Sequence, residues 1–283
     1  MKVYEIITNA ILKKLEQGSV PWRKPWTGQD QMPKNLITKK EYQGINAFIL
    51  GCQDYGSPYW LTFKQCKDLG GTVTKGARAT AVIYWNWLEI EKDGDAEEKV
   101  PLLRYYSVFN TEQCENIPED KLPRIVTSTN DIDRITICEE IINSMADRPT
   151  ITHKKQEAVY YALRDIINMP LFASFQTAEG YYSTLFHELV HSTGHEKRLA
   201  RPGITDLSPF GTPSYSKEEL IAEMGAAFLC GFAGIENVTL TNSAAYIQGW
   251  LKKLRNDKKL VIVAAAQAQK AVNYILSKAP SPE

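Results

Sequence analysis

The segment His187-Glu188-Leu189-Val190-His191 constrains this chain more than any other. It has the pattern H-E-x-x-H, and the apolar run 181–186 before it is typical of a buried helix. Two histidines four residues apart on a helix lie on one face, so both imidazoles can bind a single metal ion. Glu188, beside the first histidine, is then placed to act as a general base toward a water molecule. The pattern predicts a metal-dependent hydrolytic site.

The bulk composition is that of a globular protein with one large domain or two ordinary ones. The chain has 283 residues, of which 43% are hydrophobic and 23% are charged. The formal net charge is zero, but residues 1–90 carry 12 Lys and Arg against 7 Asp and Glu. This basic third is compatible with a polyanionic partner and equally with an ordinary solvated surface.

Cysteine usage and the start of the chain both bear on location. The cysteines are odd in number, and none forms a C-x-x-C pair, which favours reduced thiols in a cytoplasmic protein. The first residues lack the uninterrupted apolar segment of a signal peptide. No run approaches the ~18 apolar residues of a membrane span, so we expect no membrane partner. The cysteines are Cys52, Cys66, Cys114, Cys138 and Cys230.

Hydrophobic periodicity and turn residues predict an α+β fold. The acidic stretch 113–124 contains prolines and marks a boundary, so we expect two domains at residues 1–125 and 130–283. In the second, Ser216 is expected to cap a helix over 217–232, and 165–169 could hold an extended polypeptide if it is an edge strand. Other expected helices are 3–17, 63–69, 131–145, 177–194, 242–256 and 259–278, and other expected strands are 79–90, 104–109 and 158–161.

A tetrahedral zinc ion in a catalytic site takes a third protein ligand besides the two histidines. The metzincin pattern would require a histidine where this chain has Arg198, so that class is excluded. Glu219 and Glu223 are better candidates because they lie one turn apart on the predicted helix. Either can bind the metal while the other orients a ligating histidine. Gly225 and its small neighbours would let this helix approach the histidine helix closely.

The N-terminal third is rich in aromatic residues interleaved with basic ones. Single-stranded nucleic acid is held by this combination, in which bases stack on rings and phosphates meet Lys and Arg without sequence preference. The alternative is an aromatic core inside a small α+β domain. The candidate DNA-contact residues are Trp22, Arg23, Lys24, Trp26, Lys39, Lys40, Tyr59, Trp60 and Lys75.

Taken together, these motifs resemble the ArdC-type antirestriction proteins of mobile elements. The C-terminal half also resembles the wider zincin group, and the pair Glu219 and Glu223 resembles the gluzincin arrangement, in which the ligand glutamate comes first. The segments that carry the resemblance are 18–26, 42–47, 58–62, 70–76, 106–110, 182–195, 198–199, 210–211 and 218–229.

The resemblance implies an N-terminal domain that binds single-stranded DNA and a C-terminal, mainly helical zincin-like domain with a small sheet. It implies protection of incoming plasmid DNA from host restriction. Zn²⁺, or another divalent ion such as Mn²⁺, would be held by His187, His191 and Glu219, with Glu223 orienting a histidine. Glu188 would be the catalytic base of a metallopeptidase acting on a protein or peptide.

Three alternatives stay open. Glu223 could replace Glu219 as the third ligand. The chain could be a cytosolic metallopeptidase whose N-terminal aromatics recognise a protein partner. It could also be a DNA-shielding protein whose metal domain has no turnover, since a fold does not establish an activity.

Overall fold

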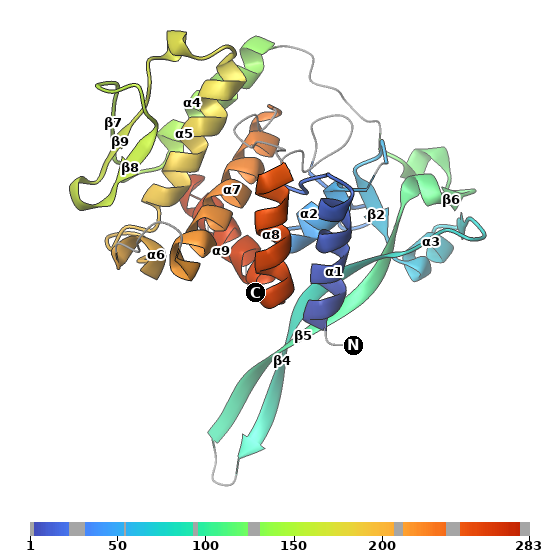
Figure 1. Ribbon diagram of the computed structural model, residues 1–283. Helices are drawn as coiled ribbons and strands as arrows, with labels where there is room; N and C mark the ends of the chain where they lie inside the picture. Colours follow the sequence, from blue (N-terminus) through green and yellow to red (C-terminus); the bar gives the residue numbers. More distant parts are fainter. Residues whose placement is uncertain are drawn as a thin grey trace.

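The computed structural model describes residues 3–22, 32–53, 55–92, 96–123, 131–206, 212–235 and 244–277. Side chains are described over the same residues except 85–101, 131–134, 213, 215 and 244. The first half combines one long helix with strands and short helices, whereas long helices dominate the second half beside a small sheet (Figure 1). The predicted α+β class is confirmed.

The N-terminal half is built on a four-stranded sheet. The short helix α3 (Phe63–Asp68) of this half begins where the sequence predicts. The Thr62 hydroxyl accepts the Gln65 amide at 3.2 Å, and the Gln65 side chain accepts the Thr62 amide at 2.8 Å, which caps the helix. The sheet order is β1 (Lys34–Asn35), β2 (Tyr59–Leu61), β5 (Ala96–Asn110) and β4 (Thr80–Lys92), and the other elements of this half are α1 (Val3–Glu16), α2 (Ile45–Gly51), α3 (Phe63–Asp68), β3 (Thr72–Val73), β6 (Cys114–Glu115), η1 (Thr111–Gln113) and η2 (Glu119–Lys121).

Strands β4 and β5 form a long antiparallel hairpin that projects from the body of the molecule (Figure 1). At its base, side chains alternate between the two faces. Val82 and Val108 face a core that contains Trp60, whereas Ile83 and Leu103 belong to the main core together with α1 and α2. The base of the hairpin is therefore fixed on both faces.

The C-terminal half is a helical group with a three-stranded sheet at one side. Helix α7 (Pro213–Ala233) begins before Ser216, so Ser216 lies inside it. The Ser216 amide donates to Thr212 O at 2.9 Å, as a helical residue does. The predicted cap at Ser216 is wrong because proline is favoured in the first turn and starts the helix earlier. The elements are α4 (Asp131–Ser144), β7 (Thr150–Thr152), β8 (Val159–Tyr161), η3 (Ala162–Arg164), β9 (Ile166–Asn168), η4 (Phe172–Ser174), α5 (Ala178–Ser192), α6 (Pro202–Thr205), α7 (Pro213–Ala233), α8 (Ala244–Asn256) and α9 (Leu260–Ile275).

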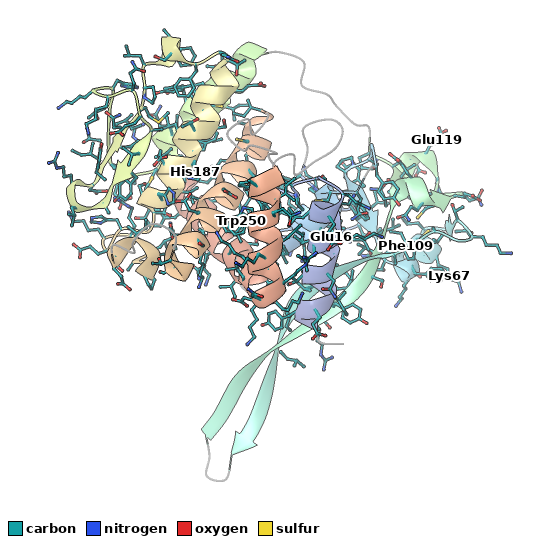
Figure 2. The ribbon with its side chains drawn as sticks, viewed as in Figure 1. Glu16, Lys67, Phe109, Glu119, His187 and Trp250 are labelled. Carbon is teal, nitrogen blue, oxygen red and sulfur yellow. The ribbon has the colours of Figure 1, made fainter. Side chains whose placement is uncertain are left out.

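The two halves share one hydrophobic core. Phe48 of α2 stacks on Phe228 of α7 with ring centroids 4.4 Å apart, and Trp22 packs edge-on against Trp250 of α8 at 5.9 Å. Trp250 lies between the N-terminal helices and the rest of the C-terminal half (Figure 2). The predicted domain boundary at 125–130 falls outside the described residues and stays a prediction.

Two sequence expectations concern thiols and membranes. All five cysteines lie within the described residues and are free thiols. Within that part of the chain, no helix is long and apolar enough to cross a membrane.

Gly225 brings α7 against α5, and we expect Gly225→Ala to destabilise the protein. A Cβ there would lie 2.7 Å from a methyl group of the fully buried Val190, which is stiff because it is β-branched. Overpacking of this kind costs about 1–3 kcal/mol and outweighs the ~1 kcal/mol that alanine gains in helix propensity.

Gly249→Ala on α8 is the matched control, because a Cβ there meets nothing within 4 Å. Alanine should stabilise the protein at that position by up to about 1 kcal/mol. Urea unfolding of both variants measures the difference. Equal effects of the two substitutions would show that α5 and α7 are not packed closely at Gly225.

Candidate metal centre

Helix α5 presents the two histidines of the H-E-x-x-H motif. Thr177 caps the helix by accepting the Gly180 amide at 3.1 Å, as the predicted start at 177 requires. Phe186, Leu189 and Val190 are fully buried, and this apolar side fixes the rotation of the helix. His187, on α5, lies in the C-terminal half (Figure 2).

Glu219 of α7 completes a group of three potential ligands with His187 and His191. The Nε2 atoms of the two histidines are 3.1 Å apart, and the Glu219 oxygens lie 3.7 Å from His187 Nε2 and 3.5 Å from His191 Nε2. Ligands of a tetrahedral ion bound at 2.0–2.1 Å are about 3.3–3.4 Å from one another. The three side chains are therefore close enough to bind one divalent metal ion together.

Glu188 lies beside this group and is 8% exposed. Burial raises the pKa of the Glu188 carboxyl above its ordinary value, and a hydrogen bond from the Tyr160 backbone amide offsets part of that shift. A carboxylate with a raised pKa that faces a metal site is suited to accept and return a proton.

His191 is oriented by Glu218, which the sequence interpretation missed. Glu218 Oε1 lies 3.4 Å from His191 Nδ1, which leaves Nε2 directed at the group of potential ligands. Arg201 donates to both Glu218 oxygens, with Nε–Oε2 at 2.9 Å and Nη2–Oε1 at 2.6 Å. Burial by itself raises the pKa of Glu218, but His191 and Arg201 lower it to about 2. Glu218 is therefore a buried anion held between two donors.

Glu223 has other partners than the expected histidine. Its Oε2 accepts the Trp22 indole N–H at 2.9 Å and the Tyr246 hydroxyl at 2.6 Å. Burial raises the pKa of Glu223 to about 7. The carboxylate that contacts His191 is that of Glu218. The expectation that Glu223 orients a ligating histidine is therefore wrong for His191. Glu223 instead links α7 to the N-terminal segment and to α8.

Strand β9 is not at the edge of the three-stranded sheet, where residues 165–169 would have to lie to hold an extended polypeptide. Its order is β7-β9-β8, so the predicted strand at 165–169 is the middle one and β8 is an edge. The Tyr160 backbone amide in β8 donates a hydrogen bond to Glu188, so this edge lies beside the H-E-x-x-H helix.

Arg198 holds β8 to the end of α5. Its Nε donates to Ser192 O at 2.7 Å, and its Nη2 donates to the Tyr160 hydroxyl at 3.2 Å. Both of its amino groups also bind the Asp165 carboxylate, and the Arg198 side chain is 1% exposed. The edge strand is therefore fixed relative to the histidines.

The two histidines differ in their affinity for protons. Burial by itself lowers the pKa of His191, but the hydrogen bond to Glu218 and the nearby charges of Glu219 and Glu188 outweigh burial and raise it to about 9. Burial and the charge of His191 lower the pKa of His187 to about 3. Because a metal binds neutral imidazole, it must displace the His191 proton at any pH below about 9.

The affinity of the metal-free protein for Zn²⁺ should therefore rise with pH. One proton leaves His191 for each bound ion, so the expected slope is about tenfold per pH unit between roughly pH 6 and 8. Competition against a chelating dye of known pH dependence measures this slope. An affinity that does not change over that range would contradict the protonation of His191.

The structure separates the predicted DNA-contact residues into three groups. Trp22 and Trp60 are 0% and 2% exposed and belong to cores, so neither can stack on a base as predicted. Arg23, Lys24 and Trp26 lie outside the described residues. Four positions remain accessible, and the Lys39 ammonium lies 5.3 Å from the centre of the Tyr59 ring. These positions are Lys39, Lys40, Tyr59 and Lys75.

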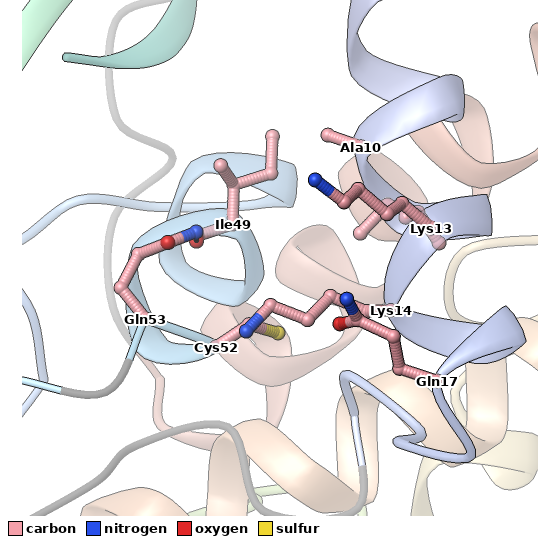
Figure 3. Close-up of a pocket in the computed structure, with 8 residues that line it drawn as sticks. Ala10, Lys13, Lys14, Gln17, Ile49, Cys52 and Gln53 are labelled. Carbon is pink, nitrogen blue, oxygen red and sulfur yellow. Dashed lines mark hydrogen bonds between the residues drawn. The ribbon is translucent and has the colours of Figure 1, made fainter. Parts of the chain in front are cut away.

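A basic cleft lies between α1 and α2. It has a volume of about 260 Å³, and Lys14 of α1 extends toward Cys52 at the end of α2, whereas Lys13 extends toward Ile49 (Figure 3). The residues that line it, all within the described part of the chain, include no carboxylate or imidazole. The cleft is thus suited to an anion and not to a metal ion.

Comparison with known proteins matches both halves. A model of the N-terminal domain of anti-restriction factor ArdC matches residues 1–109, and a model of a zincin-like metallopeptidase matches residues 138–267. The DNA primase TraC of Escherichia coli is 33% identical over an alignment of 296 positions that covers 97% of this chain. The chain spans only 20% of the length of that primase.

Two crystal structures of the antirestriction ArdC protein from the R388 plasmid share the fold. The metal-free form is 36% identical with a TM-score of 0.78, and the match covers 97% of each chain. The Mn(II)-bound form is 35% identical with a TM-score of 0.77, and the match covers 98% of each chain. With identity above 30% along both chains, and with both domain models matched, this chain belongs to the ArdC family of antirestriction proteins.

Proposed function

We propose that this chain is a cytoplasmic antirestriction protein of a plasmid or other mobile element that binds single-stranded DNA and carries a metallopeptidase centre. The observation that carries the catalytic part is the convergence of His187, His191 and Glu219 within 4.8 Å, with Glu188 beside them. The ArdC family membership supports the DNA-protecting part.

In this proposal His187, His191 and Glu219 hold one divalent ion, with Zn²⁺ as the first candidate. When bound, the ion supplies Lewis acidity at the scissile carbonyl. Glu188 takes a proton from the attacking water and delivers it to the leaving amine. Glu218 and Arg201 keep His191 in the orientation that a ligand needs.

The substrate would be an extended polypeptide lying along β8. An edge strand has free backbone groups that can pair with an added strand. The Tyr160 amide is bonded to Glu188, so a segment paired with the other backbone groups of this edge would pass beside the catalytic group. Arg198 keeps the edge fixed relative to the histidines.

The N-terminal half would hold single-stranded DNA through a half-buried tyrosine ring and exposed cations. Lys39, Lys40, Tyr59 and Lys75 remain accessible for this role. The cleft with Lys13 and Lys14 offers a further place for a phosphate. Phosphate contacts make such binding fall steeply with salt.

Fluorescence anisotropy tests the DNA-binding part directly. A labelled single-stranded oligonucleotide and its duplex are titrated with the full chain at low and moderate salt. The proposal expects preference for the single strand and weaker binding at the higher salt concentration. Absence of binding at low salt would instead favour an N-terminal half that recognises a protein.

A further inference from the structure

A pair of tyrosine rings stands on the base of the β4–β5 hairpin. Tyr84 is 41% exposed, and its ring centre lies 5.7 Å from that of Tyr106 with a tilt of 62°. In the register, Tyr84 faces Arg104 and Val82 faces Tyr106, so Tyr84, Arg104 and Tyr106 share one face.

The ring of Tyr106 is held in place by buried neighbours. The Tyr106 hydroxyl is hydrogen-bonded to the Tyr42 hydroxyl. Tyr42 is 7% exposed and packs with Trp60, Val82 and Val108 in one cluster. Rings held in this way lose little conformational entropy when a ligand stacks on them.

A cation lies beside the pair of tyrosines. Arg104 is exposed and directly across the hairpin from Tyr84. Among the side chains that the structure describes, which do not include those of 85–101, no acidic group is paired with Arg104. A chain of phosphates with stacked bases matches this combination of a charge and rings.

We propose that Tyr84, Tyr106 and Arg104 form the platform on which bases of single-stranded DNA stack. This inference rests on the proposed function and adds the binding surface to it. A duplex keeps its bases inside, so the platform selects single strands.

Three variants of the full chain test the platform by anisotropy with a labelled single-stranded oligonucleotide. Tyr84→Ala should weaken binding on the order of 5- to 100-fold, the range for loss of one stacked base. Tyr84→Phe keeps the ring and should bind like the original protein. Arg104→Gln should make the salt dependence shallower by about 0.7 in the slope of log K against log salt.

Tyr105→Ala is the matched control, because Tyr105 is 50% exposed on the opposite face of the same hairpin. It should bind DNA like the original protein. Equal weakening by Tyr84→Ala and Tyr105→Ala, or no weakening by Tyr84→Ala, would overturn the platform while leaving the proposed function in place. Failure of the original protein to bind DNA would overturn both. Circular dichroism and thermal melting confirm that each variant is folded.

Discussion

Replacing Glu188 by glutamine should abolish hydrolysis and leave metal binding intact. Glutamine keeps the size and hydrogen-bonding reach of the side chain but cannot accept a proton. General-base catalysis contributes roughly 10²–10⁴-fold, so hydrolysis should fall by at least that range. Digestion of a mixed peptide library in the presence of Zn²⁺ and single-stranded DNA, followed by mass spectrometry, measures turnover.

Two controls isolate the role of Glu188. Glu196→Gln changes an exposed glutamate in the same segment and should leave hydrolysis unchanged. His187→Ala should lose both metal and hydrolysis. Hydrolysis retained in Glu188→Gln would refute the assigned base.

A restriction assay in cells separates turnover from DNA shielding. If hydrolysis protects incoming DNA, Glu188→Gln should lose that protection. Protection that survives the substitution would identify a DNA-shielding protein in which the metal centre plays no catalytic part.

Arg201→Met should destabilise the metal-free protein by about 3–5 kcal/mol, the usual effect of breaking a buried ion pair. The substitution removes the two guanidinium N–H groups that donate to Glu218. It leaves a buried carboxylate with His191 as its remaining partner. The Arg201 Nη1–Thr193 Oγ1 bond at 2.6 Å and the Nη2–Val190 O bond at 2.7 Å are also lost. Urea unfolding in the presence of a chelator measures the change.

Arg255→Met provides the matched control. Arg255 pairs with Glu16 at 2.6 Å, but both side chains are about half exposed, at 55% and 49%. Exposed pairs contribute about 0–1 kcal/mol, so this variant should unfold almost like the original protein. If the two arginine variants lost the same stability, Arg201 would not be a buried structural cation.

The metal site illustrates what local patterns can predict. The spacing of His187 and His191 is a property of one helix. On a second helix, the local spacing limits the third ligand to Glu219 or Glu223, which lie one turn apart. The structure brings Glu219 to the histidines because the rotation of α7 is set by its packing on α5. Arg201 and Glu218 could not be paired from sequence, since that contact depends on how α6 and α7 meet.

The N-terminal aromatics show the opposite case. Composition gives the same signal for a ring in a core and a ring on a surface, so Trp22 and Trp60 were interpreted as DNA contacts although both are buried. Trp22 is buried by α8 and by Glu223, both far away in the sequence. The short helix α2 was also missed, because seven residues give too little periodicity.

Metal titration of three forms of the full chain tests the central claim most directly. By isothermal titration calorimetry the original protein should bind one divalent ion. Glu219→Gln should lose more affinity than the roughly 10–100-fold typical of an outer partner, whereas Glu223→Gln should still bind one ion. Loss of the ion in Glu223→Gln together with its retention in Glu219→Gln would contradict the proposed ligand set.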